Sequence, residues 1–390
     1  MANVFRKFRV FAKVTESEVV TSFHLKPVDG GPHWQAQPGQ YLTLRVPSAD
    51  GPVFRTYSLS GDVQQDDFHR ISVKREAAPE GSNAPDGVAS CWLHDQVQEG
   101  CVIEIAPPRG AFVLDQESER PVLLLAGGVG LTPLLAIAKV LARSNRRAWF
   151  FHACENGDVQ ALGNELKALD TVSEGRIHSH VVHRMPTERD RAEMRCDSEG
   201  LIDKALLQSL LPLDDYEVYL CGPIPFMVAM FRLLHELGIE ESRIAYEFFG
   251  EATALDRMAA KSAPLPQRAS HAPKAIATLV NLTDPDAWAI SGSIVAMAQP
   301  QGQASDVTDV LFSRSGVSVS QTGQAQTLLE LAEEAGLEPE FSCRSGICNT
   351  CRSTLIEGRV SYVEDPLETP PEGQVLICCA RPEGPVVLDI

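Results

Sequence analysis

The stretch Phe341-Ser-Cys-Arg-Ser-Gly-Ile-Cys-Asn-Thr-Cys351 places Cys343, Cys348 and Cys351 in the spacing C-x4-C-x2-C. The pair Cys378-Cys379 follows in Val-Leu-Ile-Cys-Cys-Ala-Arg-Pro382. This spacing with a distant fourth cysteine is typical of a [2Fe–2S] cluster held by four thiolates. Such a cluster transfers one electron at a time, so the sequence predicts an electron carrier or a reductase.

A structural zinc site is the competing metal interpretation of these cysteines. Zinc sites usually combine paired C-x2-C units or histidines, whereas this region has one C-x2-C unit and no neighbouring histidine. The fourth cluster ligand is left open by the pattern itself. If Cys378 and Cys379 lie in a strand, their side chains point to opposite faces and only one can bind the cluster.

Length and composition describe a globular chain with several domains. Its 390 residues predict two to four domains. No stretch approaches the ~20 apolar residues of a membrane span, and Met1–Lys7 lacks the apolar run of a secretory signal. We therefore expect a cytoplasmic protein whose cysteines are thiols or metal ligands.

The net charge of −18 argues against a nucleic-acid surface, which would be basic. Residues 307–390 contain 13 Asp and Glu against 5 Arg. This excess of negative charge could guide the segment to a basic patch on an acceptor protein, or could simply favour solubility.

The hydrophobic pattern divides the chain into three folded parts and a linker. Residues 1–115 read as short strands between turn residues, which predicts an antiparallel β-barrel. Residues 116–250 alternate apolar strands with helices, which predicts an α/β domain with a parallel sheet. Residues 251–306, rich in Ala, Pro, Ser and Gln, are interpreted as a linker. Residues 307–390 read as a hairpin, a helix, the cysteine loop and final strands, an α+β domain of β-grasp type. The expected strands are 8–14, 41–46, 56–60, 70–74, 102–106, 121–126, 148–154, 218–221, 310–313 and 317–320.

A candidate flavin site lies in Arg55-Thr-Tyr-Ser-Leu-Ser60. An arginine can hold a phosphate, and a tyrosine two residues further along the same strand face can pack on an aromatic ring. Gly87-Val-Ala-Ser90 opens a predicted helix, where backbone and hydroxyl donors can bind a phosphate.

A candidate nicotinamide site lies in Gly127-Gly-Val-Gly-Leu-Thr-Pro133, which follows a buried strand and opens a helix. Glycines allow close backbone approach, and a helix start favours negative charge. We expect Thr132 to cap this helix, with Pro133 at its first position. Tyr219-Leu-Cys-Gly-Pro223 follows another predicted strand.

Together these motifs resemble the ferredoxin–NADP reductase superfamily, and most closely the reductase portion of flavohemoglobins, without a globin domain. The resemblance rests on R-T-Y-S-L-S, I-S-V-K-R-E (71–76), G-V-A-S-x-W-L-H, G-x-G-x-T-P, C-G-P and Y-E-F-F-G (246–250), with a C-terminal plant-type ferredoxin segment as in oxygenase reductase components. In plant-type ferredoxins the last ligand stands four residues before a proline, which selects Cys378.

The resemblance implies roles for individual residues. Ser58, Cys221 and Glu247 would be catalytic, at the place where the nicotinamide meets the flavin. The flavin would be FAD, or FMN as in a minority of relatives. The implied cofactor-binding residues are Arg55, Thr56, Tyr57, Ser58, Val73, Lys74, Gly87, Val88, Ser90, Gly128, Gly130, Thr132, Cys221, Gly222, Pro223 and Phe249. The implied metal ligands are Cys343, Cys348, Cys351 and Cys378.

The expected activity is NAD(P)H-dependent electron transfer, with a hydride to the flavin and then single electrons through the cluster to a partner protein. NADH is favoured because Glu155 and Asp158, rather than arginine or lysine, follow the second predicted strand of the nicotinamide domain. The expected acceptor is a Rieske-type or other oxygenase component. The alternatives are a hybrid-cluster or other redox metalloprotein, or a flavin reductase whose ferredoxin module serves docking or redox sensing. Packing or surface roles are expected for His24, His33, His69 and His94.

Overall fold

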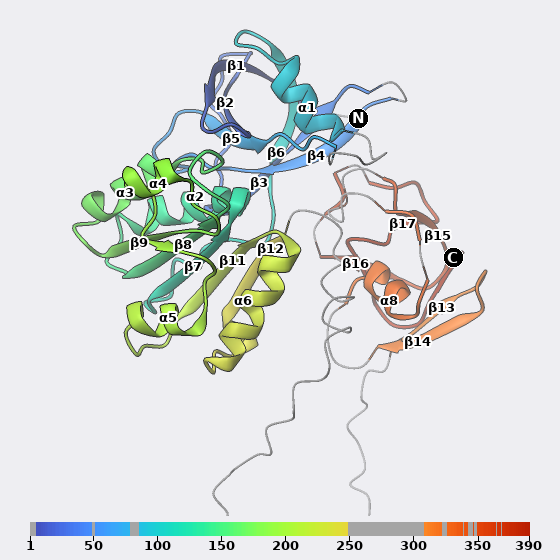
Figure 1. Cartoon of the computed structure of the whole chain (residues 1–390). Helices are drawn as coiled ribbons and strands as arrows, with labels where there is room; N and C mark the ends of the chain where they lie inside the picture. The colour runs from blue at the N-terminus through green and yellow to red at the C-terminus, as the bar shows by residue number, and fades with distance from the viewer. Residues whose placement is uncertain are drawn as a thin grey trace, which may run out of the picture.

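A computed structural model describes residues 5–48, 51–78, 86–248, 308–321, 326–337, 339–341, 346, 349–363, 365–367 and 369–390. The predicted linker 251–306 and the residues Phe249, Cys343 and Cys348 lie outside this part of the chain. Figure 1 shows a barrel, a parallel sheet flanked by helices, and a smaller C-terminal part that contains the remaining strands.

The N-terminal part is an antiparallel sheet curled into a barrel, as predicted. Its strands follow the order β4-β3-β6-β1-β2-β5, and a bridge between Leu59 and Ile71 brings the two edges together. The helix α1 (Val88–Asp95) packs Ala89 and Leu93 into the barrel core. The strands are β1 (Arg6–Thr15), β2 (Val20–Pro27), β3 (Tyr41–Val46), β4 (Val53–Ser58), β5 (His69–Lys74) and β6 (Val102–Arg109).

Two details of the barrel differ from the sequence prediction. Strand β4 ends at Ser58, not at residue 60. Strand β2 was not predicted, because its polar residues hide the hydrophobic signal. Ser22 on this strand is fully buried and shares a hydrogen bond of 2.7 Å with Ser72.

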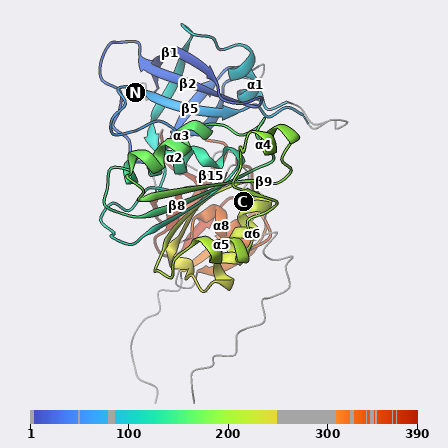
Figure 2. The ribbon, with the colours of Figure 1, turned by 60° about the vertical axis from the view of Figure 1, so that its left-hand side comes forward.

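The second part is a parallel sheet in the order β10-β9-β8-β7-β11-β12, which confirms the predicted α/β fold. Alternate residues of its central strands enter two cores: Leu124 and Phe150 face α2 and α3, whereas Leu123 and Trp149 lie on the opposite face. Figures 1 and 2 show α2 and α3 on the barrel side of the sheet and α5 and α6 on the other side. The strands are β7 (Val122–Gly127), β8 (Ala148–Cys154), β9 (Ile177–His183), β10 (Ser198–Glu199), β11 (Glu217–Gly222) and β12 (Ile244–Phe248). The helices are η1 (Gly128–Gly130), α2 (Leu131–Leu141), α3 (Gly163–Val172), α4 (Glu188–Ala192), α5 (Lys204–Leu210), α6 (Ile224–Glu236) and η2 (Glu241–Arg243).

A partly buried ion-pair network joins the barrel to helices α2 and α3, which cover one face of this sheet. Arg70 on β5 donates to the Glu165 carboxylate on α3 at 2.5 and 3.0 Å, and Lys139 on α2 reaches the same carboxylate at 2.5 Å. Removing one partner of such a network leaves an uncompensated charge in a poorly solvated place. The network therefore fixes helices α2 and α3 against strand β5 of the barrel.

The predicted cap of α2 is wrong. The helix begins at Leu131 with Gly130 as its N-cap, so Thr132 lies inside the first turn. The Thr132 hydroxyl donates to the Val129 carbonyl at 3.1 Å instead of accepting from a helix N–H. The short helix η1 shifts the start of α2 toward the glycines.

The C-terminal part is a mixed sheet in the order β14-β13-β19-β15-β17, with a small second sheet of β16 and β18. Strand β13 pairs antiparallel with β14 and parallel with β19. Thr327 and Glu330 form a reciprocal capping box at the start of α8. The predicted hairpin, helix and α+β fold are confirmed. The elements are β13 (Thr308–Phe312), β14 (Val317–Gln321), α8 (Leu328–Glu334), β15 (Arg352–Glu357), β16 (Val360–Tyr362), β17 (Gln374–Leu376), β18 (Ala380–Pro382) and β19 (Val386–Leu388).

Candidate functional site

The three residues predicted to be catalytic meet where the barrel contacts the parallel sheet. Ser58 ends β4, while Cys221 and Glu247 are paired neighbours on β11 and β12. The Ser58 hydroxyl donates to the Glu247 carboxylate at 3.5 Å, across 189 positions of sequence. Ser58 and Cys221 are buried, and the hydrogen bond between Ser58 and Glu247 is partly buried, so the access of water to this point is reduced.

Burial also sets the protonation of this site. It raises the pKa of Glu247 to about 8, against a small opposing effect of the Ser58 hydroxyl. Burial raises the pKa of the Cys221 thiol well above its usual value, and the nearby Glu247 carboxyl adds to the effect. Both groups are therefore mainly neutral at pH 7, and Glu247 holds a proton beside the hydroxyl of Ser58.

The raised pKa of Glu247 predicts a pH-dependent stability. The folded state keeps a proton that the unfolded chain, with a pKa of 4.5, releases. Stability from this group is therefore fully present below pH 4.5 and is lost as the pH rises toward about 8. We expect the melting temperature of the wild type to fall by several degrees relative to Glu247→Gln between about pH 6 and about pH 9. Parallel melting curves of the two proteins would contradict a raised pKa.

Glycines bring the η1 turn against the end of β11. A Cβ on Gly130 would collide with the backbone carbonyl of Cys221, and a Cβ on Gly222 would lie 2.9 Å from the Gly127 Cα. Gly128 has a left-handed φ of 54°, and no atom lies within 4 Å of the position that a Cβ would take there. Pro223 follows as the N-cap of α6. The predicted nicotinamide residues thus form a close contact of backbone segments, here called the backbone floor, beside the Cys221 thiol and the Phe226 ring.

The predicted flavin strand presents its residues at different depths. Arg55 and Thr56 are exposed, Tyr57 is half-buried and Ser58 is buried. The Arg55 guanidinium donates to the Phe54 carbonyl at 2.8 Å, and no ion pair of Arg55 occurs within the described residues. An exposed guanidinium beside a sheltered ring fits a ligand that combines a phosphate with an aromatic system.

The predicted phosphate site at α1 has an open helix start. Gly87 is the N-cap and supplies no side-chain cap, so backbone N–H groups remain for an anion. Ser90 accepts from the Glu76 N–H at 3.2 Å and donates to the Gly87 carbonyl at 3.3 Å. The structure thus places the Ser90 hydroxyl in a backbone network that shapes the helix start. Val88 is exposed at this start, Val73 is buried on β5, and Lys74 pairs with Glu76 at 3.0 Å.

The described cysteines of the C-terminal part lie in one buried cluster that includes Cys351, Cys378 and Cys379. Ile377 donates its backbone N–H to the Cys351 carbonyl at 3.3 Å, which joins the two cysteine-bearing segments. Residues 377–379 form a turn between β17 and β18, so the hypothesis that Cys378 and Cys379 point to opposite faces of a strand is wrong.

The two adjacent thiols have different partners in this turn. The Gly346 N–H, from the cysteine loop, donates to the Cys378 sulfur at 3.4 Å. The Cys379 thiol instead donates to the Leu376 carbonyl of its own turn at 3.5 Å. A sulfur that accepts a backbone N–H from the loop suits a cluster-bound thiolate, so this geometry supports Cys378 as the fourth ligand. Cys379 is nevertheless close, because a Cβ on Gly346 would lie 2.8 Å from its sulfur.

A cation that the sequence analysis missed lies beside the predicted nucleotide end of the sheet. Arg184, at the end of β9, forms a two-fold hydrogen-bonded ion pair with Glu155 at 2.8 and 3.0 Å. The segment Cys154–Asp158 offers Glu155 and Asp158 as predicted, and Arg184 reaches it from another part of the chain. The Arg184 guanidinium is already bonded to the Glu155 carboxylate, so it is not available to bind a phosphate.

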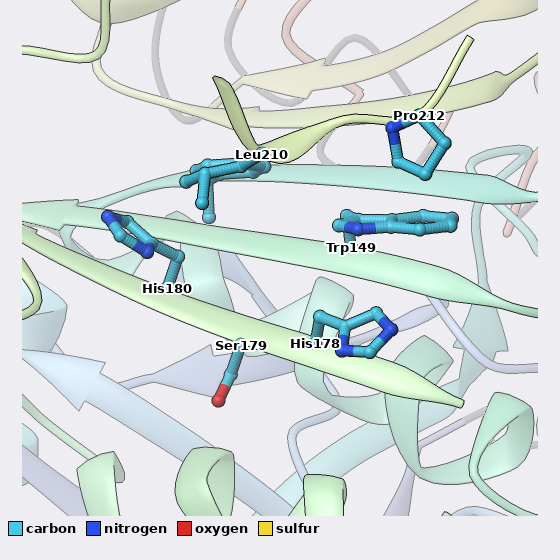
Figure 3. A pocket seen from close by; sticks show the side chains of 7 residues that line it. Trp149, His178, Ser179, His180, Leu210 and Pro212 are labelled. Atoms are coloured by element: carbon cyan, nitrogen blue, oxygen red, sulfur yellow. The ribbon is translucent and has the colours of Figure 1, made fainter. Parts of the chain in front are cut away.

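Another hollow lies on the parallel sheet, away from these residues. It is lined by Trp149, Phe151, His178, Ser179, His180, Leu210 and Pro212 (Figure 3). Trp149 and His178 start the neighbouring strands β8 and β9, so the hollow opens near the amino ends of the strands, whereas Cys221 and Glu247 lie toward the carboxyl ends. None of the helices in the described part of the chain has the length and hydropathy of a transmembrane span.

Three family models match the chain. They are the oxidoreductase FAD-binding domain over residues 7–114, the oxidoreductase NAD-binding domain over residues 124–232 and the 2Fe-2S iron-sulfur cluster binding domain over residues 312–383. The matches agree with the order of the barrel, the parallel sheet and the cysteine-bearing part.

Curated relatives match the first two parts. The flavohemoprotein of Bacillus thuringiensis subsp. konkukian is 40% identical over 256 residues, and that of Rhodopirellula baltica is 42% identical over 251 residues. These matches cover 64% and 63% of this chain, but only 62% and 60% of the relatives. The chain thus spans less than two thirds of the length of these relatives.

Two solved structures have a similar fold. The FAD/NAD-binding domain of a nitric oxide dioxygenase from Vibrio cholerae is 36% identical, covers 63% of this chain and 99% of its own, and superposes with a TM-score of 0.56. A phthalate dioxygenase reductase is 23% identical, covers 99% of this chain and 98% of its own, and gives a TM-score of 0.52. The second likeness extends the shared fold over all three parts.

Proposed function

We propose that this chain, whose three parts belong to the oxidoreductase FAD-binding, oxidoreductase NAD-binding and 2Fe-2S cluster binding families, passes electrons from NADH to an oxygenase component. The chain is a flavoprotein iron–sulfur oxidoreductase. The observation that carries the proposal is the contact of Ser58 with Glu247, because it joins the predicted flavin strand to the predicted nicotinamide domain at one buried point.

The cofactors supply the redox chemistry: a bound flavin takes two electrons as a hydride, and a bound [2Fe–2S] cluster takes one electron at a time. The chain's own residues orient and shield these groups. Arg55 and the start of α1 would hold the flavin phosphates, and Tyr57 would flank the ring. The backbone floor at Gly130 and Gly222 would support the nicotinamide, while Glu247 keeps its proton and orients the Ser58 hydroxyl.

The choice of an oxygenase acceptor rests on similar folds with stated roles. A phthalate dioxygenase reductase, a ferredoxin reductase of carbazole 1,9a-dioxygenase and a self-sufficient cytochrome P450 monooxygenase share parts of this fold. The acidic residues of the C-terminal part also lie at the surface: Asp309, Glu330, Glu334, Glu340, Glu357, Asp365, Glu372 and Glu383 are exposed. Such a surface suits an acceptor with a basic patch, and predicts that acceptor reduction weakens as salt increases.

An anaerobic titration with NADH tests the electron path. We expect visible absorption to report reduction of the flavin and electron paramagnetic resonance to report reduction of the cluster. A flavin that is reduced beside a cluster that stays oxidised would instead support a docking or redox-sensing module. A purified Rieske-type oxygenase component and a hybrid-cluster protein then serve as acceptors in parallel. Turnover with the hybrid-cluster protein alone would contradict the oxygenase assignment.

The Glu155–Arg184 pair leads to a prediction about the cosubstrate. In Glu155→Gln the guanidinium loses its carboxylate partner and can bind the 2′-phosphate of NADPH. We expect the ratio of kcat/KM for NADPH to that for NADH to rise by about tenfold, equivalent to about 1.4 kcal/mol.

A matched control for this change is Glu199→Gln. Glu199 forms a similar exposed pair with Arg191 at 2.9 Å on the same domain. An unchanged cosubstrate ratio in Glu155→Gln, or an equal change in the control, would remove Glu155 from cosubstrate selection.

A further inference from the structure

A short segment between β16 and β17 is bonded to both cysteine-bearing regions. The Val363 N–H donates to the Cys379 carbonyl at 2.8 Å, and the Leu367 N–H donates to the Gly346 carbonyl at 2.9 Å. Pro366 also packs on the cysteine loop, because a Cβ on Gly346 would lie 3.3 Å from the Pro366 Cα. Residues 365–367, here called the docking segment, are therefore bonded to the cysteine loop at Gly346, and Val363 shortly before them is bonded to the turn that holds Cys379.

The docking segment also contacts the barrel. The Leu367 side chain is only 7% exposed and shares a buried cluster with Phe5, Tyr41 and Ala106, against which Phe54 packs. Arg109, the last residue of β6, donates to the Asp365 carbonyl. Within the described residues, an apolar contact and a charged hydrogen bond thus join the C-terminal part to the barrel.

The place of contact is the strand pair that carries the predicted flavin residues. Tyr41 on β3 is the register partner of Ser58 on β4, and it is also paired with Arg109 on β6. Phe54 directly precedes Arg55 on β4. The docking segment therefore lies beside the strand that is predicted to bind the flavin.

The separation of this contact from the hydrophobic cores indicates a positioning role. The buried cluster around Leu367 is separate from the cores of the barrel and of the C-terminal part. Interfaces of this kind within one chain resemble transient protein contacts, and relative motion is expected when they are weakened. Each part therefore keeps its own core when the contact is lost, whereas the distance between the parts changes.

We propose that the docking segment holds the predicted cluster loop against the flavin-binding strands, with Leu367 and Arg109 as positioning residues for electron transfer between the two sites. The proposal rests on the proposed function for its electron path. With both groups bound, the flavin would supply single electrons to the cluster, and the rate of this transfer would depend on the separation of the two sites that the docking segment maintains.

The test uses the full chain with both cofactors and the variants Leu367→Ala and Arg109→Ala. Stopped-flow absorption would follow flavin reduction by NADH and then cluster reduction, and small-angle X-ray scattering would measure the radius of gyration. We expect unchanged flavin reduction, cluster reduction slowed by at least about tenfold, and a larger radius of gyration in both variants. The matched control is Leu311→Ala on β13, because Leu311 is exposed and lies outside the Leu367 cluster.

The proposal would be overturned if both variants kept the wild-type radius of gyration and reduced the cluster at the wild-type rate. If Leu367→Ala binds less iron, the result with Arg109→Ala decides between the two explanations. Arg109 belongs to the barrel, and within the described residues it donates to the Asp365 backbone carbonyl of the segment. Scattering also separates this proposal from the proposed function. If NADH fails to reduce the wild-type cluster while the variants still expand, the electron path is wrong and the docking contact stands.

Discussion

Replacing Cys378 with alanine is expected to abolish assembly of the [2Fe–2S] cluster, whereas Cys379→Ala is expected to leave it intact. A [2Fe–2S] cluster needs four thiolates, and Cys378 is the member of the pair whose sulfur accepts an N–H from the cysteine loop. Iron content, visible absorption and electron paramagnetic resonance measure the cluster directly. Reduction of cytochrome c by NADH should fall by about 100-fold or more in Cys378→Ala because the one-electron carrier is lost, while reduction of the flavin continues.

The two variants control for each other. Both cysteines are buried, with exposed fractions of 5% and 3%, in one turn, so each substitution removes a similar amount of packed sulfur. A cluster that survives Cys378→Ala but is lost in Cys379→Ala would assign the ligand to Cys379. Retention in both variants would place the fourth ligand elsewhere.

Ser58→Ala is expected to slow flavin reduction by NADH by about 100-fold, the usual effect of removing one oriented donor from a reaction site. The Ser58 hydroxyl lies where the barrel meets the parallel sheet and donates a hydrogen bond to Glu247. Its loss removes a donor from the reaction site and also leaves the Glu247 carboxyl without this hydrogen bond. Stopped-flow measurement at saturating NADH reports this step, and the flavin absorption of the purified variant reports cofactor content.

Ser22→Ala is a suitable control because it removes a buried barrel hydroxyl that is bonded to Ser72. If Ser58→Ala reduces its flavin within about twofold of the wild-type rate at equal flavin content, Ser58 is not part of the hydride step. A double-mutant cycle with Glu247→Gln would measure the coupling of the two groups, which is expected to be non-additive because they share a hydrogen bond.

The sequence predicted much of the fold because its strongest patterns are local. The continuous apolar run of β7 and the alternation of β3 identify strands without knowledge of their partners. The strands that were missed include β2, β9, β10 and β12, and two of them, β2 and β9, contain polar residues whose hydrogen bonds exist only in the folded sheet. The histidines of β9 illustrate this, since His180 bonds to Ser198 at 2.8 Å.

Residues of the candidate site could be predicted from the sequence only where they belong to a recognisable motif. Ser58, Cys221 and Glu247 lie in three separate motifs, and a resemblance to known reductases was needed to connect them. Arg184 and Leu367 belong to no motif. Their roles arise from an ion pair over 29 positions and from packing between separate parts of the chain, which no local pattern encodes.

The floor of backbone at Gly130 and Gly222 has a consequence for engineering. A Cβ added at Gly130 would meet the Cys221 carbonyl, and one added at Gly222 would meet the Phe226 ring and the Gly127 backbone, so neither position accepts a side chain with which to reshape recognition of the nicotinamide. Attempts to change the cosubstrate are therefore better directed at Glu155 and Arg184, which are accessible and replaceable and which we propose lie near the adenosine end of the cosubstrate.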